Sequence, residues 1–354
     1  MNIVHIITGL KLGGAERMLL SICERLSSRG HRVVVVILNP SARDMLPRFI
    51  EMGVEVVIFD VKSRIHRINN LWELFCYIKR NQYDIIHCHL IHAIMVGLVI
   101  RIIFRMRVFA TIHSIDEGGG MFSILLRIFI AYFNKIIFIS DRVAVAFGGH
   151  KLPSNAVIIN NFIEFDSINK CPRLNIHSNC ISFCTISRLE EIKNIDKIIN
   201  SFALFHEKVP NSILHIYGVG QVGDSLNILI DNLNLSDCVS LKGATNSPSE
   251  VLNSYQFFVT ACVSEGFGLS LLEAAAHGLF CIAVDNPSHR FILDESTYCL
   301  IFKYEDLDFI HSAYRQYVNV GYDTNSDKYN SRLKRLFCFD GYINSLLLAY
   351  SECL

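Results

Sequence analysis

The sequence predicts an α/β protein built from two doubly wound parallel-sheet domains in series. Short runs rich in β-branched residues alternate with helix-length segments over residues 1–165, and the alternation returns over residues 181–335. This strand–helix–strand repetition is typical of parallel sheets with right-handed crossovers. The length of 354 residues suits two domains, and the 51% hydrophobic content suits buried sheets. Residues 166–180 are polar, aperiodic and broken by a proline, so we interpret them as a linker.

The first domain is expected to contain mostly apolar strands of six or seven residues at 3–8, 32–38, 54–60, 84–90, 107–113 and 135–140. The segment 14–30, between the first two of these strands, is expected to be a helix. Its apolar residues Met18, Ile22 and Leu26 recur on one helical face, and Gly30 is a typical helix stop.

The second domain repeats this pattern, with strands expected at 181–187, 212–218, 238–243, 255–261 and 280–285. Both domains are therefore predicted to be Rossmann-like. Because ligands of such sheets bind beyond the carboxyl ends of the strands, we expect the two domains to face each other across a ligand-binding cleft. Within residues 336–354, the segment 340–354 is expected to form an amphipathic helix that packs on the domains.

The net charge is zero but unevenly distributed, with +7 on residues 1–165 and −7 on the remainder. A basic half indicates an anionic partner, either nucleic acid or an anionic membrane surface, unless both halves are simply solvated. Arg and Lys interrupt the apolar segments 93–109 and 121–140, which disfavours a membrane-spanning helix. These segments fit a helix lying on a membrane surface, or a buried helix whose arginines reach solvent.

The twelve cysteines are scattered without a C-x-x-C pair, and no basic region precedes the first apolar run. The sequence therefore indicates neither a disulfide framework nor a signal peptide. We expect a cytosolic protein whose cysteines are reduced thiols and serve mostly as small core residues.

The segment "GVGQVG" at 218–223 follows an expected strand and matches G-x-G-x-x-G, which is typical of dinucleotide-binding sites. Such a site also needs an acidic residue near the end of the next strand, where it holds the ribose. That strand, 238–243, ends in Lys242 and Gly243. The sequence therefore disfavours a dehydrogenase, and these glycines need another explanation.

The segment "SRLEEIKN" at 187–194 follows the first expected strand of the second domain. Arg188 and Lys193 would then lie at a strand's carboxyl end, where an Arg fork and a Lys point charge suit a diphosphate. Since Glu190 and Glu191 lie between them, the segment also fits a solvated charge run.

The segment "SEGFGLSLLEAAAHG" at 264–278 combines a glycine turn with two carboxylates. Glu265 lies in the expected strand-to-helix turn, where Gly266 and Gly268 let the backbone approach a ligand. The helix beginning near Leu269 would direct its N–H groups and positive dipole end at a phosphate. Glu273 lies one turn into that helix and can accept two sugar hydroxyls. Either glutamate alone fits a structural role, but both beside a glycine turn favour a sugar-nucleotide site.

Three histidines, His87, His89 and His92, are close in sequence, and His87 and His89 share one face of an expected strand. No carboxylate or fourth ligand accompanies them, so the requirements of a metal site are not met. The Asp-x-Asp at 306–308 is expected to supply negative charge where a helix begins, not to bind a metal. We therefore expect no metal ion.

The chain resembles the family 4 retaining glycosyltransferases of GT-B architecture, of the type that makes bacterial surface polysaccharides. The resemblance covers nearly the whole sequence, and the Glu265-x7-Glu273 segment is its most specific element. The sequence departs from the family pattern at Ser114, at Phe162 and after Asp285. The matching motifs, in chain order, are Gly13-Gly14-Ala15-Glu16, His113, "NNFIE" (160–164), Arg188 with Lys193, "YGVGQ" (217–221) and Glu265 with Glu273.

The resemblance implies that Arg188 and Lys193 grip the donor diphosphate. Glu273 would hold the nucleotide ribose, and Glu265 would contact hydroxyls of the donor sugar. The backbone of the glycine-rich loops would line the same site through Gly218, Gly220, Phe267, Gly268 and Leu269.

In the first domain, the resemblance places His113 close to the reacting sugar. Gly13 and Gly14 would form a loop that faces the diphosphate and the acceptor. Asn161 matches an asparagine of the family near the crossover between the domains.

The implied reaction is a retaining, metal-independent transfer of a hexose or N-acetylhexosamine from a nucleotide sugar, with UDP as the expected nucleotide. The expected acceptor is a lipid-linked oligosaccharide of O-antigen, capsule or lipopolysaccharide synthesis, at the inner face of the cytoplasmic membrane. No cofactor is expected. The alternatives are a GT-B epimerase or phosphorylase, and a non-catalytic protein that binds anionic surfaces. Nucleic acid is not an expected partner, because two cleft glutamates would repel a phosphate backbone.

Overall fold

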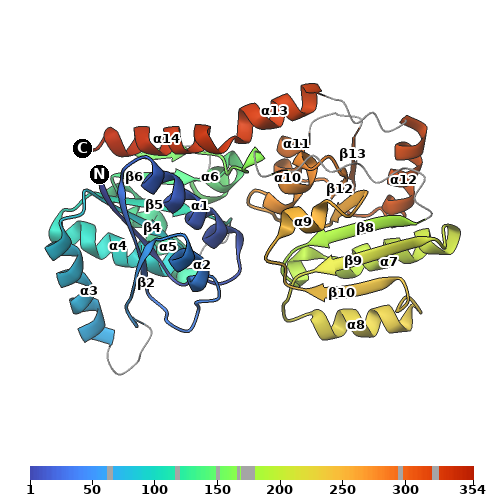
Figure 1. Cartoon of the computed structure of the whole chain (residues 1–354), viewed down its shortest axis with the longest axis horizontal. Helices are drawn as coiled ribbons and strands as arrows, with labels where there is room; N and C mark the ends of the chain where they lie inside the picture. Colours follow the sequence, from blue (N-terminus) through green and yellow to red (C-terminus); the bar gives the residue numbers. More distant parts are fainter. Residues whose placement is uncertain are drawn as a thin grey trace. The chain divides into compact units, whose positions relative to one another are not determined.

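The computed structural model describes residues 1–61, 67–115, 120–148, 152–165, 168, 180–293, 298–320 and 327–354. Apart from residues 168 and 180, the predicted linker at 166–180 lies outside the described residues. The chain forms two compact units, one of residues 1–161 with 340–354 (unit 1) and one of residues 162–339 (unit 2) (Figure 1).

Unit 1 is built on a seven-stranded sheet in the order β3-β2-β1-β4-β5-β6-β7, and every pairing is parallel. Strand order reverses direction between β1 and β4, which is where ligands of doubly wound sheets bind. Six of these strands were predicted from the sequence, and β7 was not. The strands are β1 Asn2–Ile7, β2 Arg32–Ile37, β3 Glu55–Ile58, β4 Ile85–His89, β5 Val108–Ile112, β6 Lys135–Phe138 and β7 Ala156–Ile158.

Helices cover both faces of this sheet. Helix α4 lies so close to the sheet that a Cβ on Gly97 would come within 2.4 Å of Cys88 Sγ. A glycine is therefore required at this contact. The described helices of unit 1 are α1 Gly14–Ser28, α2 Leu46–Glu51, α3 Arg67–Asn81, α4 Ile91–Phe104, α5 Gly120–Phe129, α6 Asp141–Gly148 and α14 Phe339–Ser351.

The helix predicted over 340–354 is α14, and it packs on the sheet face opposite α4. Its Tyr350 is fully buried and meets the rings of Phe109 and His87 edge-on, at 5.0 and 5.7 Å between centroids. Burying such an aromatic side chain contributes about 1.5–3 kcal/mol. At the other end of α14, Asp340 pairs with Arg25 and Arg29 of α1 at 2.7 and 2.9 Å. These pairs are largely exposed and add little, so buried side chains hold α14 in place.

Unit 2 is built on a six-stranded parallel sheet in the order β10-β9-β8-β11-β12-β13. Five strands were predicted from the sequence and β13 was not. The two parallel-sheet α/β units confirm the predicted fold class. The strands are β8 Ile181–Ile186, β9 Ser212–Tyr217, β10 Val239–Gly243, β11 Phe257–Thr260, β12 Phe280–Val284 and β13 Cys299–Phe302.

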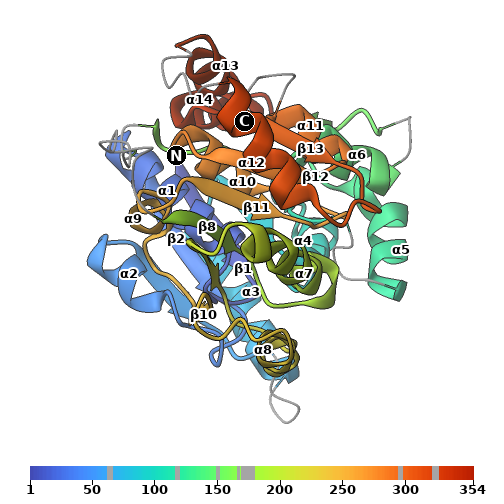
Figure 2. The ribbon, with the colours of Figure 1, turned by 90° about the vertical axis from the view of Figure 1, so that its right-hand side faces the viewer.

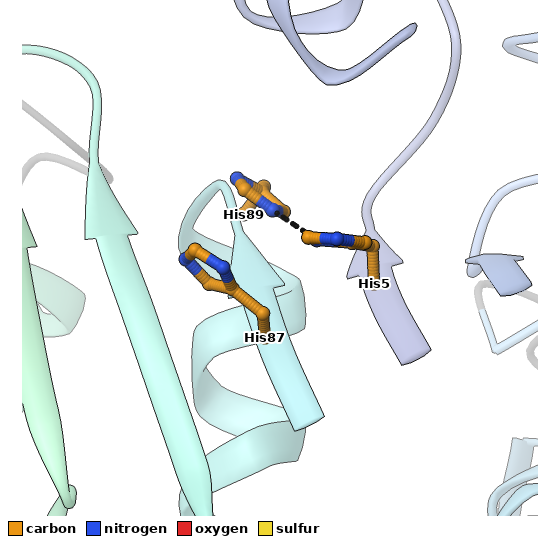
Figure 3. A group of neighbouring side chains, drawn as sticks. All are labelled: His5, His87 and His89. Carbon is orange, nitrogen blue, oxygen red and sulfur yellow. Dashed lines mark hydrogen bonds between the residues drawn. The ribbon is translucent and has the colours of Figure 1, made fainter. Parts of the chain in front are cut away.

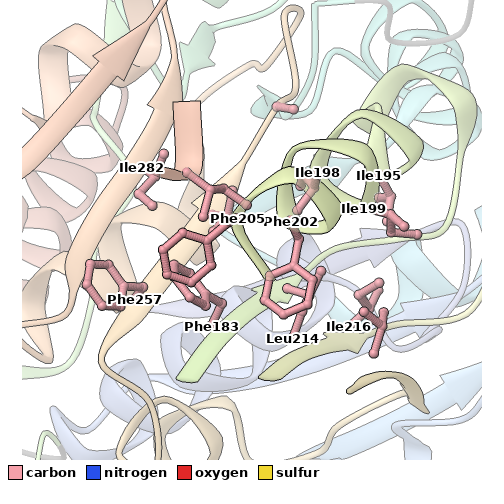
Figure 4. Close-up of a cluster of buried hydrophobic side chains, with 14 of the residues drawn as sticks. Phe183, Ile195, Ile198, Ile199, Phe202, Phe205, Leu214, Ile216, Phe257 and Ile282 are labelled. Atoms are coloured by element: carbon pink, nitrogen blue, oxygen red, sulfur yellow. The ribbon is translucent and has the colours of Figure 1, made fainter. Parts of the chain in front are cut away.

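Helices α7, α8 and α12 cover one face of the unit 2 sheet, and α10 and α11 lie on the other (Figure 1, Figure 2). The buried core under α7 is rich in phenylalanine (Figure 4). Phe183 stacks on Phe257 at 4.7 Å and meets Phe205 edge-on at 5.2 Å. The helices are α7 Ile195–Lys208, α8 Gly223–Asn232, α9 Pro248–Leu252, α10 Leu269–Ala276, α11 Pro287–Ile292, α12 Phe309–Val320 and α13 Asp327–Phe337.

Three further expectations from the sequence concern the cysteines, the helices and residues 306–308. Every cysteine that the structure describes is a free thiol, as expected. None of the described helices reaches the length and apolarity that crossing a membrane requires. Helix α12 begins directly after Asp308, in agreement with the interpretation of residues 306–308.

Candidate functional site

The loop that carries Arg188 and Lys193 leaves the carboxyl end of β8, as predicted. The Arg188 guanidinium donates a hydrogen bond to the Glu190 carboxylate, and its side chain is 68% exposed. An exposed pair of this kind is weak, so an anionic ligand can compete for the guanidinium. Lys193 ends a single 3-10 turn at Glu191–Lys193, just before α7.

The backbone of Gly218 and Gly220 packs directly against this loop. A Cβ on Gly218 would lie 1.8 Å from the Ser187 carbonyl oxygen, and one on Gly220 would lie 2.2 Å from that of Leu189. Gly218 also has a φ of +145°, which disfavours any side chain. Between the two glycines, the Leu189 N–H donates to the Val219 carbonyl at 3.0 Å. These contacts explain the first two glycines of "GVGQVG" without a dinucleotide.

The third glycine of that motif differs from the other two. A Cβ on Gly223 would make only an ordinary contact, 3.6 Å from a methyl carbon of Leu189. Gly223 is simply the first residue of α8. The segment therefore matches G-x-G-x-x-G only in the spacing of its glycines. The structure requires glycine at the first two positions and not at the third.

Lys193 and Glu265 meet at the carboxyl edge of the unit 2 sheet. The Lys193 ammonium donates to the Glu265 carboxylate at 2.9 Å, and both side chains are mostly buried, at 16% and 22% exposed. Lys193 follows β8 and Glu265 follows β11, and these are neighbouring parallel strands. The structure thus brings together two residues that are 72 positions apart in the sequence.

The charges of this pair reinforce each other. Burial lowers the pKa of Lys193, but the Glu265 carboxylate outweighs burial, so the net shift is upward. Burial raises the pKa of Glu265, but Lys193 outweighs it, so the net shift is downward. Both groups are therefore charged at neutral pH. Burial and the nearby Glu265 raise the pKa of Cys262 to about 11, which keeps this thiol protonated.

The glycine turn after β11 leads directly into α10. Gly268 is the N-cap residue of α10 with a φ of +98°, and Leu269 is the first helical residue. Phe267 is buried and meets the Phe337 ring edge-on at 5.6 Å, which anchors the turn. Glu273 lies in the second turn of α10, with its Oε2 atom shielded from solvent. The turn therefore aims the amino end of α10 beyond the carboxyl edge of the sheet.

Sequence reasoning missed two residues that hold this turn, Asn286 and Ser288. The Asn286 amide donates to the Cys262 carbonyl and the Ser288 hydroxyl to the Glu265 carbonyl, both at 2.9 Å. Both residues lie at the start of α11, in the segment that departs from the family pattern after Asp285. The Asn286–Pro287 pair is a helix-start signal that could have located the first of them.

In unit 1, the predicted residues lie at or beyond the carboxyl edge of the sheet. Gly13 is the N-cap residue of α1 and Gly14 its first residue, directly after the loop from β1. His113 follows the end of β5 and is half-buried. Asn161 is 2% exposed, and its Oδ1 atom has no hydrogen-bond partner among the described residues.

A cluster of three buried histidines lies next to His113. His5 of β1 and His87 and His89 of β4 each offer a ring nitrogen, all within 4.8 Å of one another (Figure 3). His5 was missed from the sequence, and His92, which was considered, is exposed on α4. The parallel register explains the cluster, because His5 is paired with His87 and side chains alternate between faces.

Hydrogen bonds account for the nitrogens of this cluster, with one exception. His87 uses both nitrogens, Nδ1 with the Tyr350 hydroxyl at 2.5 Å and Nε2 with Thr111 Oγ1 at 2.7 Å. His5 Nδ1 bonds His89 Nε2 at 3.0 Å, and His89 Nδ1 bonds His113 Nε2 at 3.2 Å. Within the described part of the chain, His5 Nε2 is buried without a partner.

Burial keeps these imidazoles neutral. It lowers the pKa of His5 to about 3 and the pKa of His113 to about 4. The pKa values of His87 and His89 also lie well below the ordinary value, first through burial and then through neighbouring histidines. Neutral imidazole is the form that binds a metal ion, but the nitrogens of His87 are already used. The expectation of no metal ion stays a prediction.

Comparison with known families covers both units. The profile of Glycosyltransferase Family 4 matches residues 12–167, and that of Glycosyl transferases group 1 matches residues 169–314. Anabaena Alr3699/HepE in complex with UDP-glucose has a TM-score of 0.85 at 16% identity, over 99% of this chain and 100% of that chain. The lipopolysaccharide outer core galactosyltransferase WaaB has a TM-score of 0.74 at 16% identity, over 100% of both chains.

Curated relatives match over shorter stretches. The UDP-N-acetylglucosamine--peptide N-acetylglucosaminyltransferase GtfA subunit of Streptococcus pneumoniae is 37% identical over 106 residues, 30% of this chain and 21% of that protein. The poly(ribitol-phosphate) alpha-N-acetylglucosaminyltransferase of Staphylococcus aureus is 33% identical over 120 residues, 34% of this chain and 23% of that protein. Each match thus spans less than a quarter of the relative. The two family profiles and the two parallel-sheet units establish that the chain belongs to the family 4 glycosyltransferases of GT-B architecture.

Proposed function

We propose that this protein is a retaining, metal-independent glycosyltransferase that moves a hexose or N-acetylhexosamine from a UDP-sugar to a lipid-linked oligosaccharide in bacterial surface polysaccharide synthesis. The observation that carries the proposal is the buried Lys193–Glu265 pair at the carboxyl edge of the unit 2 sheet. Arg188 lies in the same loop as Lys193, and the amino end of α10 follows Glu265. This set combines donors for a diphosphate with a carboxylate for sugar hydroxyls.

The chemistry follows from where charge develops. When the bond between sugar and diphosphate breaks, positive charge grows on the sugar and negative charge on the leaving diphosphate. Arg188, Lys193 and the amino end of α10 are proposed to stabilise the leaving group, because preorganised donors act without reorganisation. The acceptor hydroxyl then attacks on the face that the diphosphate leaves, and the departing phosphate oxygen takes its proton.

UDP is the proposed nucleotide because UDP or a UDP-sugar appears in the descriptions of two comparison proteins. HepE was solved with UDP-glucose, and the streptococcal relative is named for UDP-N-acetylglucosamine. The proposed surface-polysaccharide role agrees with the name of WaaB, a lipopolysaccharide galactosyltransferase. These properties belong to those proteins, and the experiments below test them for this chain.

An anionic membrane surface is the proposed location of the acceptor, and the α4–α5 face of unit 1 supports it. This face exposes large apolar side chains, with Arg101 of α4 and Arg127 of α5 beside them. Apolar side chains that can enter a lipid headgroup layer, together with adjacent cations, fit an anionic membrane. The exposed side chains are Val99, Ile102 and Ile103 of α4, Ile124 and Ile128 of α5, and Tyr132 of the 3-10 turn Ile130–Tyr132 that follows α5.

The nucleotide is tested by thermal unfolding with UDP, GDP, ADP, NAD or NADPH, each with and without EDTA. A ligand at about 100 times its dissociation constant adds about 2.7 kcal/mol of stability. We expect a shift with UDP that EDTA leaves unchanged and that Arg188→Ala removes. Lys208→Ala is the matched control, because Lys208 makes a similar exposed pair at the carboxyl end of α7. A shift with NAD or NADPH alone would contradict the proposal.

Activity is tested by UDP release from UDP-glucose and UDP-N-acetylglucosamine, with and without lipid-linked oligosaccharide extracts. Arg188→Ala is expected to lower turnover about 100-fold or more, as loss of a transition-state donor does. Near-normal turnover in that variant would remove Arg188 from the mechanism. Sugar-phosphate turnover that needs no acceptor would instead favour an epimerase or phosphorylase.

Membrane binding is tested by sedimentation with vesicles of phosphatidylglycerol and phosphatidylcholine, compared with phosphatidylcholine alone. Replacing both Ile102 and Ile103 with Ser is expected to abolish binding to the anionic vesicles. Ile228→Ser in α8 is the matched control, since Ile228 is 61% exposed but lies in unit 2. Equal loss in both variants would contradict a specific role of the α4–α5 face.

A further inference from the structure

His5, His89 and His113 form a hydrogen-bonded chain across three adjacent strands of unit 1. His5 Nδ1 bonds His89 Nε2 at 3.0 Å, and His89 Nδ1 bonds His113 Nε2 at 3.2 Å. The first bond is drawn in Figure 3. The chain starts in the fully buried interior at His5 and ends at half-buried His113, just beyond β5.

Because of the sheet register, each successive histidine from His5 to His113 lies closer to the carboxyl edge of the sheet, where ligands bind. His5 is level with His87 in the β1–β4 pairing, so His89 lies two residues farther toward the carboxyl end. His89 is level with Thr111 in the β4–β5 pairing, so His113 again lies two residues farther. Each hydrogen bond therefore links two neighbouring strands, and its second histidine lies two residues closer to the carboxyl edge on the same face of the sheet.

We propose that His89, supported by His5, is a positioning residue that fixes the ring orientation of His113 for its part in sugar transfer. This inference rests on the proposed function. His113 meets His89 through Nε2, so Nδ1 is the ring nitrogen of His113 that lies outside this hydrogen-bonded chain. In a neutral imidazole one nitrogen donates and the other accepts, so the tautomer of His113 is tied to the tautomers of His89 and His5.

The surroundings of the three hydrogen-bonded histidines indicate that these side chains are held rigidly. His5 and His89 are 0% and 1% exposed, and the His87 ring lies beside the His89 ring, tilted by 30° with 4.3 Å between centroids. His87 is itself held by hydrogen bonds to Thr111 and Tyr350. A side chain locked in this way can hold a reacting group within the narrow tolerance that catalysis requires.

A metal ion is the competing explanation of the cluster. Two imidazole nitrogens bound to one tetrahedral zinc ion at about 2.0–2.1 Å would lie about 3.3 Å apart. The His5–His89 contact is shorter, at 3.0 Å, and has the separation of a direct hydrogen bond. His87 would also have to give up a hydrogen bond to bind a metal. The hydrogen-bonded chain therefore accounts for the geometry better.

Two substitutions at His89 separate positioning from simple stability. An Asn side-chain amide reaches roughly where Nδ1 lies, so His89→Asn keeps a partner for His113 and loses the one for His5. A Gln amide reaches roughly where Nε2 lies, so His89→Gln keeps a partner for His5 and loses the one for His113. Asn is the smaller side chain and leaves the larger cavity, so His89→Asn is expected to be the less stable variant.

The readouts are kcat and KM for UDP release from UDP-glucose or UDP-N-acetylglucosamine, with the UDP-induced thermal shift measured alongside. We expect His89→Gln to lower kcat about 100-fold with little change in KM, since a displacement of about 1 Å can cost that much. His89→Asn is expected to keep kcat within about tenfold of wild type, despite its lower stability. The UDP-induced shift should be unchanged in both variants, because UDP is proposed to bind unit 2.

Several outcomes would overturn the inference while the proposed function stands. These are wild-type kcat in His89→Gln, and losses of kcat that follow stability in both variants. Loss of activity on EDTA treatment that zinc restores would overturn the inference together with the metal independence of the proposed function. If neither His89 variant folds, His5→Asn, which keeps an amide near Nδ1, is compared with His5→Leu; equal kcat in these two would also overturn it. Full activity in His113→Ala would also overturn the inference, whereas no UDP shift in the wild type would overturn the proposed function.

Discussion

Acidification is expected to destabilise unit 1 through its buried histidines. His5 has a pKa of about 3 in the folded chain because it is buried, against an ordinary value of 6.5. Between these values the unfolded chain binds the proton and the folded chain does not. The stability of the fold is therefore complete above about pH 6.5 and falls as the pH drops below that value.

The size of the effect follows from the same two values. Lowering the pH from about 8 to about 5 costs roughly 1.4 kcal/mol for each of the 1.5 units below 6.5, or about 2 kcal/mol for His5 alone. His87 and His89 are buried and neutral too, and their lowered pKa values act in the same direction. A loss of this size is a large fraction of the stability of a typical domain, about 5–15 kcal/mol.

The assay is urea unfolding at several pH values, followed by circular dichroism and by fluorescence of Trp72, which lies in α3 of unit 1. His5→Phe removes one titrating group, so its loss of stability between about pH 8 and 5 should be about 2 kcal/mol smaller than in the wild type. His92→Gln removes an exposed histidine of the same unit and is the matched control. Equal pH dependence of His5→Phe and wild type would refute the reasoning.

Three further predictions concern local geometry. Gly218→Ala places a Cβ 1.8 Å from a carbonyl oxygen at a φ of +145°, so it should lower both the melting temperature and the UDP-induced shift, whereas Gly223→Ala should leave both near wild type. Lys193→Met leaves Glu265 buried without its cation and should cost about 3 kcal/mol in urea unfolding. Adding Glu265→Gln should recover part of that cost, and purely additive losses would argue against the pair. Gly97→Ala places a Cβ 2.4 Å from a cysteine Sγ of β4 and should cost about 1–3 kcal/mol, so an unchanged melting temperature would contradict the close packing of α4.

The central strands of both sheets could be predicted because they are buried on both faces and read as continuous apolar runs. The two strands that were missed, β7 and β13, lie at sheet edges and pair with one neighbour each. They are also only three and four residues long. The other two edge strands, β3 and β10, could still be predicted from their apolar residues, so an edge position weakens the sequence pattern without removing it.

Two residues of the candidate site could be placed from the sequence because each lies in a short motif directly after a predicted strand. Arg188 and Glu265 could be placed in loops after their strands, since carboxyl ends of parallel strands meet at one edge. The contact of Lys193 with Glu265 depends on β8 and β11 being neighbours, which chain order does not state. His5 was missed for the same reason, because β1 lies beside β4 only in the folded sheet.

Helix α14 makes unit 1 discontinuous in the sequence. Residues 340–354 follow all of unit 2 in the chain, yet they belong to the unit that residues 1–161 form. During synthesis, His87 therefore stays uncovered by Tyr350 until unit 2 has left the ribosome. A chimera that takes unit 1 from a relative must exchange both segments together, because a junction at residue 161 alone would pair the sheet of one protein with the helix α14 of another.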